Sequence, residues 1–166
     1  MDNIDLFKRA MGNYPTGVTV VTALDKEGAP IGLTVNSFAS VSLDPLLVLW
    51  SIDKRVSTYD TFKEIDQFAI NILGDNQADI ANLFASHHQD RFANCEWHQS
   101  EHQLPIIKDA IASLQCKTFK RVEAGDHMIL IGEIIDIDVE NKSPLLYHGR
   151  KMGALPTAFH EENGGV

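Results

Sequence analysis

The sequence predicts a mainly β protein, an antiparallel barrel with a few short flanking helices. Short runs of β-branched or apolar residues, bounded by turn-forming residues, recur along the chain. The segments between them leave no room for a helix after every strand, which disfavours a parallel βαβ sheet. With 166 residues and 44% hydrophobic content, the chain suits a single domain over residues 1–166, with flexible tails expected over 1–6 and 156–166.

The first half of the chain is expected to contribute two short helices and four strands. Apolar residues recur at helical spacing near the N-terminus, and Tyr14-Pro15-Thr16-Gly17 then ends the helix. The expected elements are a helix over 4–11, a hairpin of strands over 17–24 and from 31 onward around a turn at 25–30, a strand over 46–52 buried on both faces, a short helix over 56–65 capped by Ser57 or Asp53, and a strand over 68–73.

The second half is expected to contribute one helix, a long loop and a long hairpin. Ile80, Leu83 and Phe84 recur at helical spacing after Asp75, a suitable cap, so a helix is predicted over 75–86. Residues 87–103 are polar and lack a period of 2 or 3.6, which predicts a surface loop. A strand over 112–119, with Cys116 in the core and one largely wet face, and a strand over 127–140 are expected to meet at a turn around Gly125.

Charge and composition disfavour several classes of partner. The formal net charge of -9 offers no electrostatic footprint for nucleic acid or an anionic membrane surface. The N-terminus lacks the pattern of a signal peptide, and no apolar run approaches the ~18 residues that span a bilayer. Cys95 and Cys116 lie in unlike contexts, so we expect no disulfide and a location in the reduced cytoplasm.

Other chemical motifs are weak. His98 and His102 would share a face only on a helix, and their segment has no apolar stripe, so the histidines of 87–102 predict no metal site and their role stays open. A serine beside Asp126 and His127 could be drawn as a hydrolytic triad, but no G-x-S-x-G elbow is present. The glycine patterns of Rossmann folds and P-loops are also missing from the sequence.

The stretch from Ile31 to Trp50 has the character of a binding site. Its hydroxyl and amide side chains lie between two apolar runs and comprise Thr34, Asn36, Ser37, Ser40 and Ser42. A planar ligand with a polar rim requires several convergent hydrogen bonds above an apolar floor. Ordinary polar alternation on an exposed strand is the competing interpretation.

Five motifs in order resemble the flavin reductase-like family with the FMN-binding split-barrel fold. They are P-T-G-V-T-V-V-T, G-L-T-V-N-S-F-A-S-V-S-L-D-P, F-A-I-N-I-L, G-D-H at 125–127 and P-L-L-Y-H-G-R near the end, and the resemblance extends from about residue 7 to 155. It implies a homodimeric split β-barrel that binds FMN or FAD near the subunit boundary and transfers a hydride to it from NADH or NADPH. Such proteins often supply reduced flavin to a separate monooxygenase.

The resemblance also implies roles for individual residues. The positions that line the isoalloxazine are Thr34, Asn36, Ser37, Ala39 and Ser40, and those that hold the ribityl phosphate are Ser51, Lys54 and Ser57. His127 falls beside the flavin where nicotinamide would stack, and Asn71, in the strand that follows, is expected to bind the cofactor as well. Two features depart from many relatives: Leu43-Asp44-Pro45-Leu46 has one proline instead of two, and Met152 stands where an aromatic residue is common.

Residue chemistry supports parts of this assignment. Small residues such as Ala39 let the backbone approach a planar ring closely. A flavin that accepts a hydride gains negative charge at its pyrimidine end, and fixed backbone N–H groups stabilise that charge. Lys54 and Arg55 directly precede an expected helix start near Ser57, which is where an acidic chain could hold a phosphate. The competing interpretations are that Lys54 and Arg55 are solvated, that Ala39 only packs, and that His127 lies in an ordinary surface turn.

Two further functions stay open, and one assembly is expected. A non-catalytic FMN-binding redox or storage protein would carry the same cofactor residues, and an oxidase of the pyridoxamine-phosphate kind would act on an amine. The strand from Met128 to Ile134 is apolar on both faces. A barrel interior can cover only one of them, so we expect a homodimer.

Overall fold

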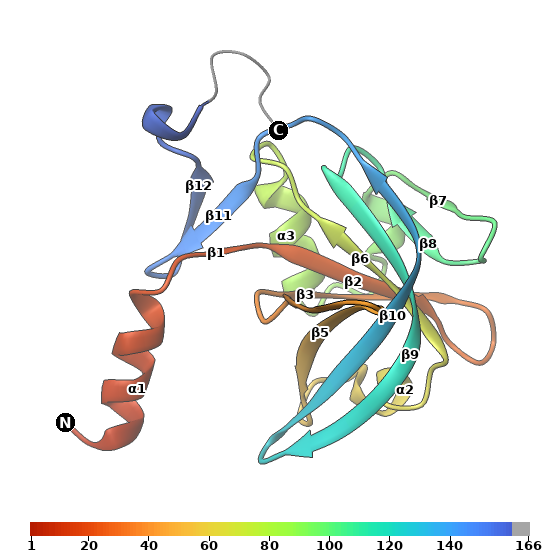
Figure 1. Ribbon diagram of the computed structural model, residues 1–166, viewed down its shortest axis with the longest axis horizontal. Helices are drawn as coiled ribbons and strands as arrows, with labels where there is room; N and C mark the ends of the chain where they lie inside the picture. Colours follow the sequence, from red (N-terminus) through yellow and green to blue (C-terminus); the bar gives the residue numbers. More distant parts are fainter. Residues whose placement is uncertain (161–166) are drawn as a thin grey trace.

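The computed structural model describes residues 1–160 and forms a β-barrel with a small appended sheet (Figure 1). Its elements are α1 (Asn3–Gly12), β1 (Thr16–Gly17), β2 (Thr19–Leu24), β3 (Pro30–Val35), β4 (Ala39–Leu43), β5 (Leu46–Asp53), α2 (Tyr59–Phe62), β6 (Gln67–Ile72), α3 (Ala78–Ala85), the 3-10 turn η1 (Phe92–Asn94), β7 (Trp97–Gln99), β8 (Pro105–Ile107), β9 (Ala112–Ala124), β10 (His127–Val139), β11 (Leu145–His148), β12 (Lys151–Ala154) and the 3-10 turn η2 (Thr157–Phe159).

Seven antiparallel strands form the main sheet, in the order β3-β2-β6-β9-β10-β5-β4. The apolar side chains of one face fill the interior, where Trp50 makes edge-to-face contacts with Phe62 and Phe68 at ring-centroid distances of 5.2 and 5.9 Å. Gly132 of β10 lets that strand lie close to the side chains of the interior, because a Cβ there would lie 2.6 Å from the Phe68 ring and 2.8 Å from the Cys116 Cβ. The predicted antiparallel barrel is confirmed.

The barrel is split between β3 and β5. No backbone ladder joins these two strands in the described part of the chain, and a side chain from the segment after β3 bonds to β5 instead. Ser37, in the connection from β3 to β4, accepts a hydrogen bond from the Ser51 N–H at 2.9 Å and donates one to the Ser51 carbonyl at 3.1 Å. This hydroxyl therefore occupies the place of a ladder pair at the opening.

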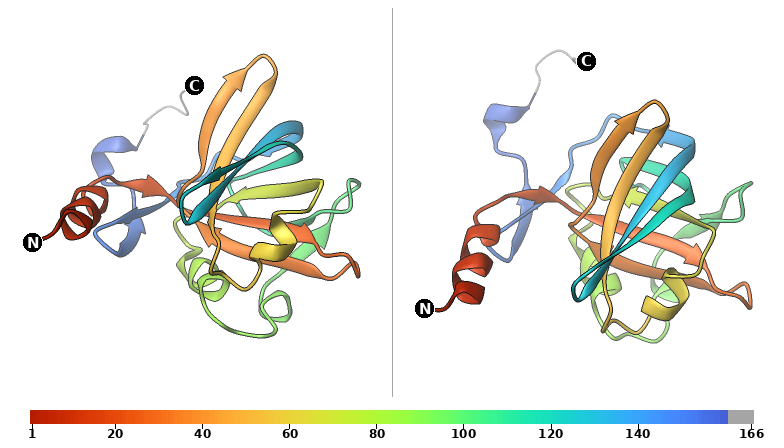
Figure 2. Two further views of the ribbon diagram at one scale, coloured as in Figure 1. Left: turned by 90° about the horizontal axis from the view of Figure 1, so that it is seen from below. Right: turned by 60° about the horizontal axis from the view of Figure 1, so that its bottom comes forward.

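A second sheet, in the order β1-β11-β12, carries the N-terminal helix away from the barrel (Figures 1 and 2). Asp2 caps α1 by accepting a hydrogen bond from the Asp5 N–H at 2.9 Å. The helix buries none of its residues in this chain. The hairpin of β4 and β5 also projects from the barrel, as Figure 2 shows.

The helices differ from the expected ones at their ends. α1 begins at Asn3, so it includes part of the expected N-terminal tail, and residues 157–159 of the expected C-terminal tail form η2. The predicted helix over 56–65 is too long, since α2 covers only Tyr59–Phe62, and neither Ser57 nor Asp53 caps it. α3 begins at Ala78 after Gln77, so the prediction of Asp75 as its cap is wrong. Residues 161–166, also in the expected tail, lie outside the described residues.

The strands also differ in two places. The predicted loop over 87–103 contains η1 and β7, and β7 pairs with β8. β8, beyond the predicted loop, packs against β2 and β6, whereas residues 87–103 lie at the surface as expected, so the prediction missed only the regular structure that they contain. The first half of β9 is buried on both faces instead of one. The hairpin of β2 and β3, and the strands β5, β6 and β10, agree with the predicted ones.

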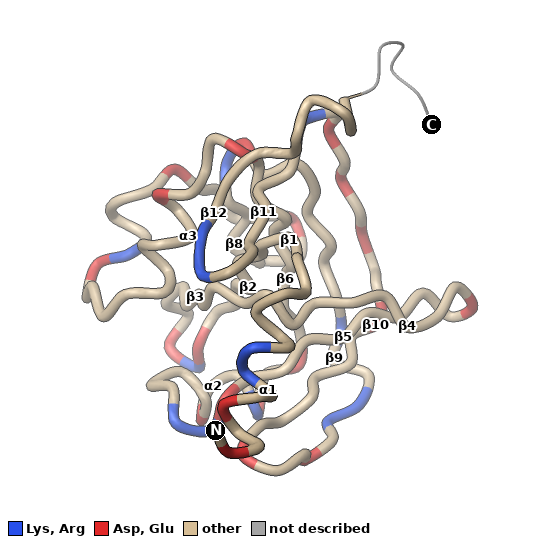
Figure 3. The backbone as a smooth tube through the Cα atoms, turned by 90° about the vertical axis from the view of Figure 1, so that its left-hand side faces the viewer, with Lys and Arg blue, Asp and Glu red and all other residues tan. Residues whose placement is uncertain are grey.

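Charged residues are spread over the surface. Figure 3 shows acidic segments around the molecule with short basic stretches between them, and no continuous basic face on the side drawn. Among the described helices, none is long and apolar enough to cross a membrane.

Candidate functional site

Some of the expected site residues lie together on the outer face of β5 and β10. His127 is paired with Asp53 across the two strands, and Ile129 is paired with Ser51. Because Ile52 and Met128 point into the core, the alternation of a strand turns Ser51, Asp53 and His127 to the opposite face. Ala39 extends the same face, since it pairs with Leu49 of β5.

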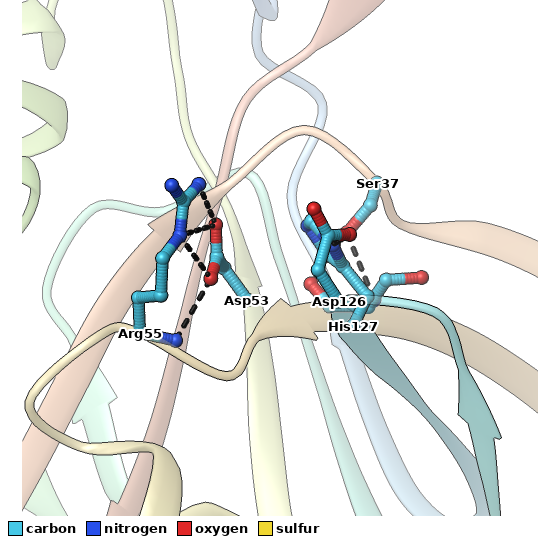
Figure 4. Close-up of polar contacts among 6 residues, drawn as sticks. Ser37, Asp53, Arg55, Asp126 and His127 are labelled. Carbon is cyan, nitrogen blue, oxygen red and sulfur yellow. Dashed lines mark hydrogen bonds and ion pairs between the residues drawn. The ribbon is translucent and has the colours of Figure 1, made fainter.

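Two carboxylates lie on this face, Asp126 against the His127 ring and Asp53 paired with Arg55 (Figure 4). The Nδ1 atom of His127 lies 2.8 Å from Oδ1 of Asp126, and 42% of the His127 side chain is exposed. The neighbouring Asp53 pairs with Arg55, whose Nη2 lies 2.7 Å from Oδ2. The turn between β9 and β10 is joined to the end of β5 by the Lys54 N–H, which donates to the Asp126 carbonyl at 3.0 Å.

The ionisation of these groups follows from their contacts. The hydrogen bond with His127 lowers the pKa of Asp126, and hydrogen bonds from Arg55 lower the pKa of Asp53. Both carboxylates are therefore ionised near neutral pH. An ionised partner at Nδ1 favours the proton on that nitrogen, which leaves Nε2 of His127 for another group.

A second set of expected residues lines a cleft of about 250 Å³ between β3, α3 and the β11-β12 hairpin. Thr34 and Asn36 lie on one side of it, and Tyr147 and Met152 lie on the other. The Thr34 hydroxyl donates to the Ala81 carbonyl at 2.7 Å, whereas Asn36 is exposed. Met152, the departure noted in the sequence, thus contributes a thioether where a ring would otherwise lie.

The remaining expected residues lie in two further places. Ser40 is exposed on β4, an edge strand of the main sheet, next to Val48 of β5. Ser57 lines a separate hollow beyond the end of β5, whereas the Lys54 ammonium lies 3.6 Å from the Glu123 carboxylate on the β9 side.

Asn71 belongs to the core and not to any of these surfaces. It is fully buried, and its Nδ2 donates to the Val20 carbonyl at 2.9 Å and to the Thr22 hydroxyl at 3.0 Å. Its Oδ1 accepts from the Ile107 N–H at 2.9 Å. These bonds join β2, β6 and β8, so the expectation that Asn71 contacts a cofactor does not agree with its position.

Reasoning from sequence missed Asp53 and Arg55 as neighbours of His127, and considered Asp126 only as part of a triad. Asp126 carries a local signal, because it directly precedes His127 in the G-D-H motif. The nearness of Asp53 depends on the register of β5 against β10, which no local pattern reveals.

Comparisons with known proteins agree with this architecture. The chain matches the family described as Flavin reductase like domain over residues 11–156. It is 48% identical over 134 residues to the reductase component of a flavin-dependent trigonelline monooxygenase from Acinetobacter baylyi, a match that covers 81% of this chain and 43% of the relative. It is 40% identical over 152 residues to FMN reductase (NADH) SmoA from Agrobacterium fabrum, covering 92% of this chain and 86% of the relative.

A solved structure extends the comparison to three dimensions. The NADH:FAD oxidoreductase SgcE6 of Streptomyces globisporus, in complex with NAD and FAD fragments, is similar with a TM-score of 0.89 and 33% identity, covering 95% of this chain and 96% of that one. The chain spans less than half the length of the Acinetobacter relative. The match over residues 11–156 nevertheless includes every strand of the barrel, and the chain belongs to the flavin reductase-like domain family.

Proposed function

We propose that the chain is an NAD(P)H:flavin oxidoreductase, which reduces FMN or FAD by hydride transfer from NADH or NADPH. The similarity to a relative named FMN reductase (NADH) over 92% of the chain carries this proposal. The exposed His127, held by Asp126 beside the split of the barrel, is the group in the fold best placed to meet a nicotinamide.

The residues around the split fit a flavin. β4 is an edge strand, so backbone N–H groups beside Ala39 and Ser40 lack a ladder partner on one side. Fixed N–H groups of this kind stabilise negative charge on a bound ring without an acid of their own. When bound, a flavin supplies the ring atom that accepts the hydride.

Several of the expected residues then have distinct tasks. Thr34 and Asn36 present polar groups to one end of the ligand, and Ala39 lets the backbone approach its plane. Ser37 and Ser51 fix the width of the split through their two hydrogen bonds. Ser57, beyond the end of β5, lines a hollow and offers a hydroxyl for the flavin phosphate that the family resemblance assigns to it. His127 orients the nicotinamide, with Asp126 holding its ring.

The chain is further proposed to act as a homodimer in the cytoplasm and to deliver reduced flavin to a monooxygenase. Support for the dimer comes from α1, whose large apolar residues are exposed, including Ile4 at 64% and Phe7 at 66%. Support for the monooxygenase comes from the Acinetobacter relative, which is named as a reductase component.

Steady-state oxidation of NADH and of NADPH with added FMN, FAD or riboflavin tests the activity. We expect a rate that rises and saturates with flavin concentration. A protein that binds FMN but oxidises neither nucleotide above the buffer rate would be the redox or storage protein instead. Activity on an amine substrate, without nucleotide oxidation, would identify an oxidase.

A further inference from the structure

Two carboxylates flank the imidazole of His127 on the outer face of β5 and β10. Asp126 directly precedes it in the chain, and its Oδ1 lies 2.8 Å from Nδ1 of the ring. Asp53 is paired with His127 across the two strands, and side chains that are paired across an antiparallel ladder lie next to one another. Hydrogen bonds from Arg55 lower the pKa of Asp53 most, and the charge of a protonated His127 lowers it further, so the two side chains interact.

The cations of the same turn lie beyond these carboxylates. Arg55 contacts Asp53 through Nη2 at 2.7 Å and through Nε at 3.1 Å. Figure 4 shows the guanidinium and the His127 ring on opposite sides of the Asp53 carboxylate. The Lys54 ammonium lies 3.6 Å from Glu123 on the β9 side. Seen from the imidazole, the negative charge of Asp53 therefore comes before the positive charge of Arg55.

The hydride donor changes its own charge during the proposed reaction. The bond between C4 of the dihydronicotinamide and its hydrogen breaks, and the hydrogen leaves with both bonding electrons for the flavin ring. The nicotinamide ring is neutral before this step and positively charged after it, while the flavin gains the negative charge. Fixed charges beside the place where charge develops stabilise the transition state more than the reactants. Carboxylates beside the nicotinamide therefore favour the transfer.

We propose that Asp53, together with Asp126, stabilises the positive charge that the nicotinamide ring gains as it gives up the hydride. The proposal rests on the reductase function given above and on the place of the nicotinamide against His127. It adds a charge preference, because the site then binds the cationic, oxidised ring more tightly than a neutral ring. Arg55 holds Asp53 in place, and its own charge opposes the effect from a greater distance.

The strength of the effect follows from the exposure of the carboxylate. The Asp53 side chain is 21% exposed, so water screens its charge less than that of a fully exposed residue. A charge pair near a protein surface changes an equilibrium by a few-fold up to about 10-fold. The expected preference for a cationic ring is of that size.

The test compares two nucleotides that differ in the charge of the nicotinamide ring. NAD⁺ carries the cationic ring, and tetrahydro-NAD carries a partly saturated, neutral ring that donates no hydride. Both have the same adenosine and pyrophosphate, so the ratio of their dissociation constants reports the ring alone. Calorimetric titration into protein saturated with FMN measures both constants. High salt should reduce the preference of wild type for NAD⁺, since it screens the carboxylates.

Asp53→Asn removes the charge and keeps the shape of the side chain. It should weaken the binding of NAD⁺ by about 3–10-fold and leave tetrahydro-NAD within about 2-fold. It should also lower kcat for NADH by a similar factor with little change in KM, because the lost interaction develops only during the transfer. Asp60→Asn, which removes the partner of Lys63 on α2, is a matched control that should leave every constant unchanged.

Arg55→Gln separates an electrostatic role from a structural one. It breaks the same ion pair as Asp53→Asn but removes the opposite charge. If the pair acted only by holding the end of β5, both variants would weaken NAD⁺ and tetrahydro-NAD alike. The proposal predicts instead that Arg55→Gln leaves the preference for NAD⁺ unchanged or increases it by about 2-fold.

Two results would overturn the role of Asp53. They are an equal loss for the two nucleotides in Asp53→Asn, and a wild-type protein that oxidises NADH but binds NAD⁺ no more tightly than tetrahydro-NAD. A wild-type protein whose preference for NAD⁺ depends on Asp53 but that fails to oxidise NADH would refute the reductase and leave the charge preference standing. A protein that binds neither nucleotide would refute both.

Discussion

The two ring nitrogens of His127 have different surroundings. Nδ1 lies 2.8 Å from the Asp126 carboxylate, and no described hydrogen bond involves Nε2. The pKa of Asp126 is lowered by this contact and that of the opposite Asp53 by Arg55, so anionic carboxylates lie near the imidazole throughout the neutral range. The ring is therefore held by one edge, and its other edge is free to meet a ligand.

Replacing His127 tests this arrangement. We expect His127→Ala to lower kcat/KM for NADH by about 10–100-fold and to change flavin affinity by no more than a few-fold, because the ring orients nicotinamide and is not needed to hold the flavin. Steady-state kinetics and a flavin titration measure the two effects. His98→Ala, in the exposed β7, is a matched control that should behave as wild type. Unchanged kinetics for His127→Ala would remove the residue from the site.

At the scale of single elements, β6 depends on one buried amide. Asn71 satisfies groups of β2 and β8 at once, and an alanine at this position would leave the Ile107 N–H and the Val20 carbonyl without these partners. We expect Asn71→Ala to lower the free energy of unfolding by about 2 kcal/mol or more. A buried donor or acceptor without a partner has lost its hydrogen bonds to water, and no bond within the protein replaces them. Urea denaturation measures this loss.

The control for β6 is the exposed Asn36, whose replacement by alanine should change stability by no more than about 0.5 kcal/mol. Flavin affinity of folded Asn71→Ala should match that of wild type. A variant with normal stability and lost flavin binding would return Asn71 to the cofactor site.

Most strands could be predicted because alternation and β-branched runs are local properties of the sequence. The helix over 56–65 could not be bounded, because Val56, Tyr59 and Ile65 pack on the barrel core through turns that mimic helical spacing. The strand β7 was missed since its three residues show no alternation. It is fixed by distant contacts. Its partner strand β8 is held to β6 by the hydrogen bond that the Ile107 N–H donates to Asn71.

The same distinction applies to the site. The G-D-H motif and the hydroxyl-rich stretch around Ser37 are local, so both were visible in the sequence. The contact of Arg91 with the Gly32 carbonyl is not local, because it arises only when the loop after α3 folds against the start of β3.

Two projections of the described chain expose large apolar side chains. One is α1, with Phe7 exposed to 66% and Met11 to 50%, and the other is the hairpin of β4 and β5, where Leu43 is exposed to 89%. A ten-residue helix is marginal in water by itself, so α1 is stable only when its apolar face is covered. A second copy of the chain offers such a cover, and two copies would also protect the projecting hairpins.

Charge placed on α1 should separate this dimer. We expect wild type to sediment as a dimer at micromolar concentration and Ile4→Glu with Phe7→Glu to sediment as a monomer, because each new carboxylate would lose water in the interface. Lys8→Glu, on the same helix, alters charge without removing an apolar group and should stay dimeric. The family resemblance places flavin near the subunit boundary, so the monomeric variant should also bind FMN less tightly. A wild-type protein that is monomeric at this concentration would contradict the dimer, and a monomeric variant with full FMN affinity would place the whole site within one chain.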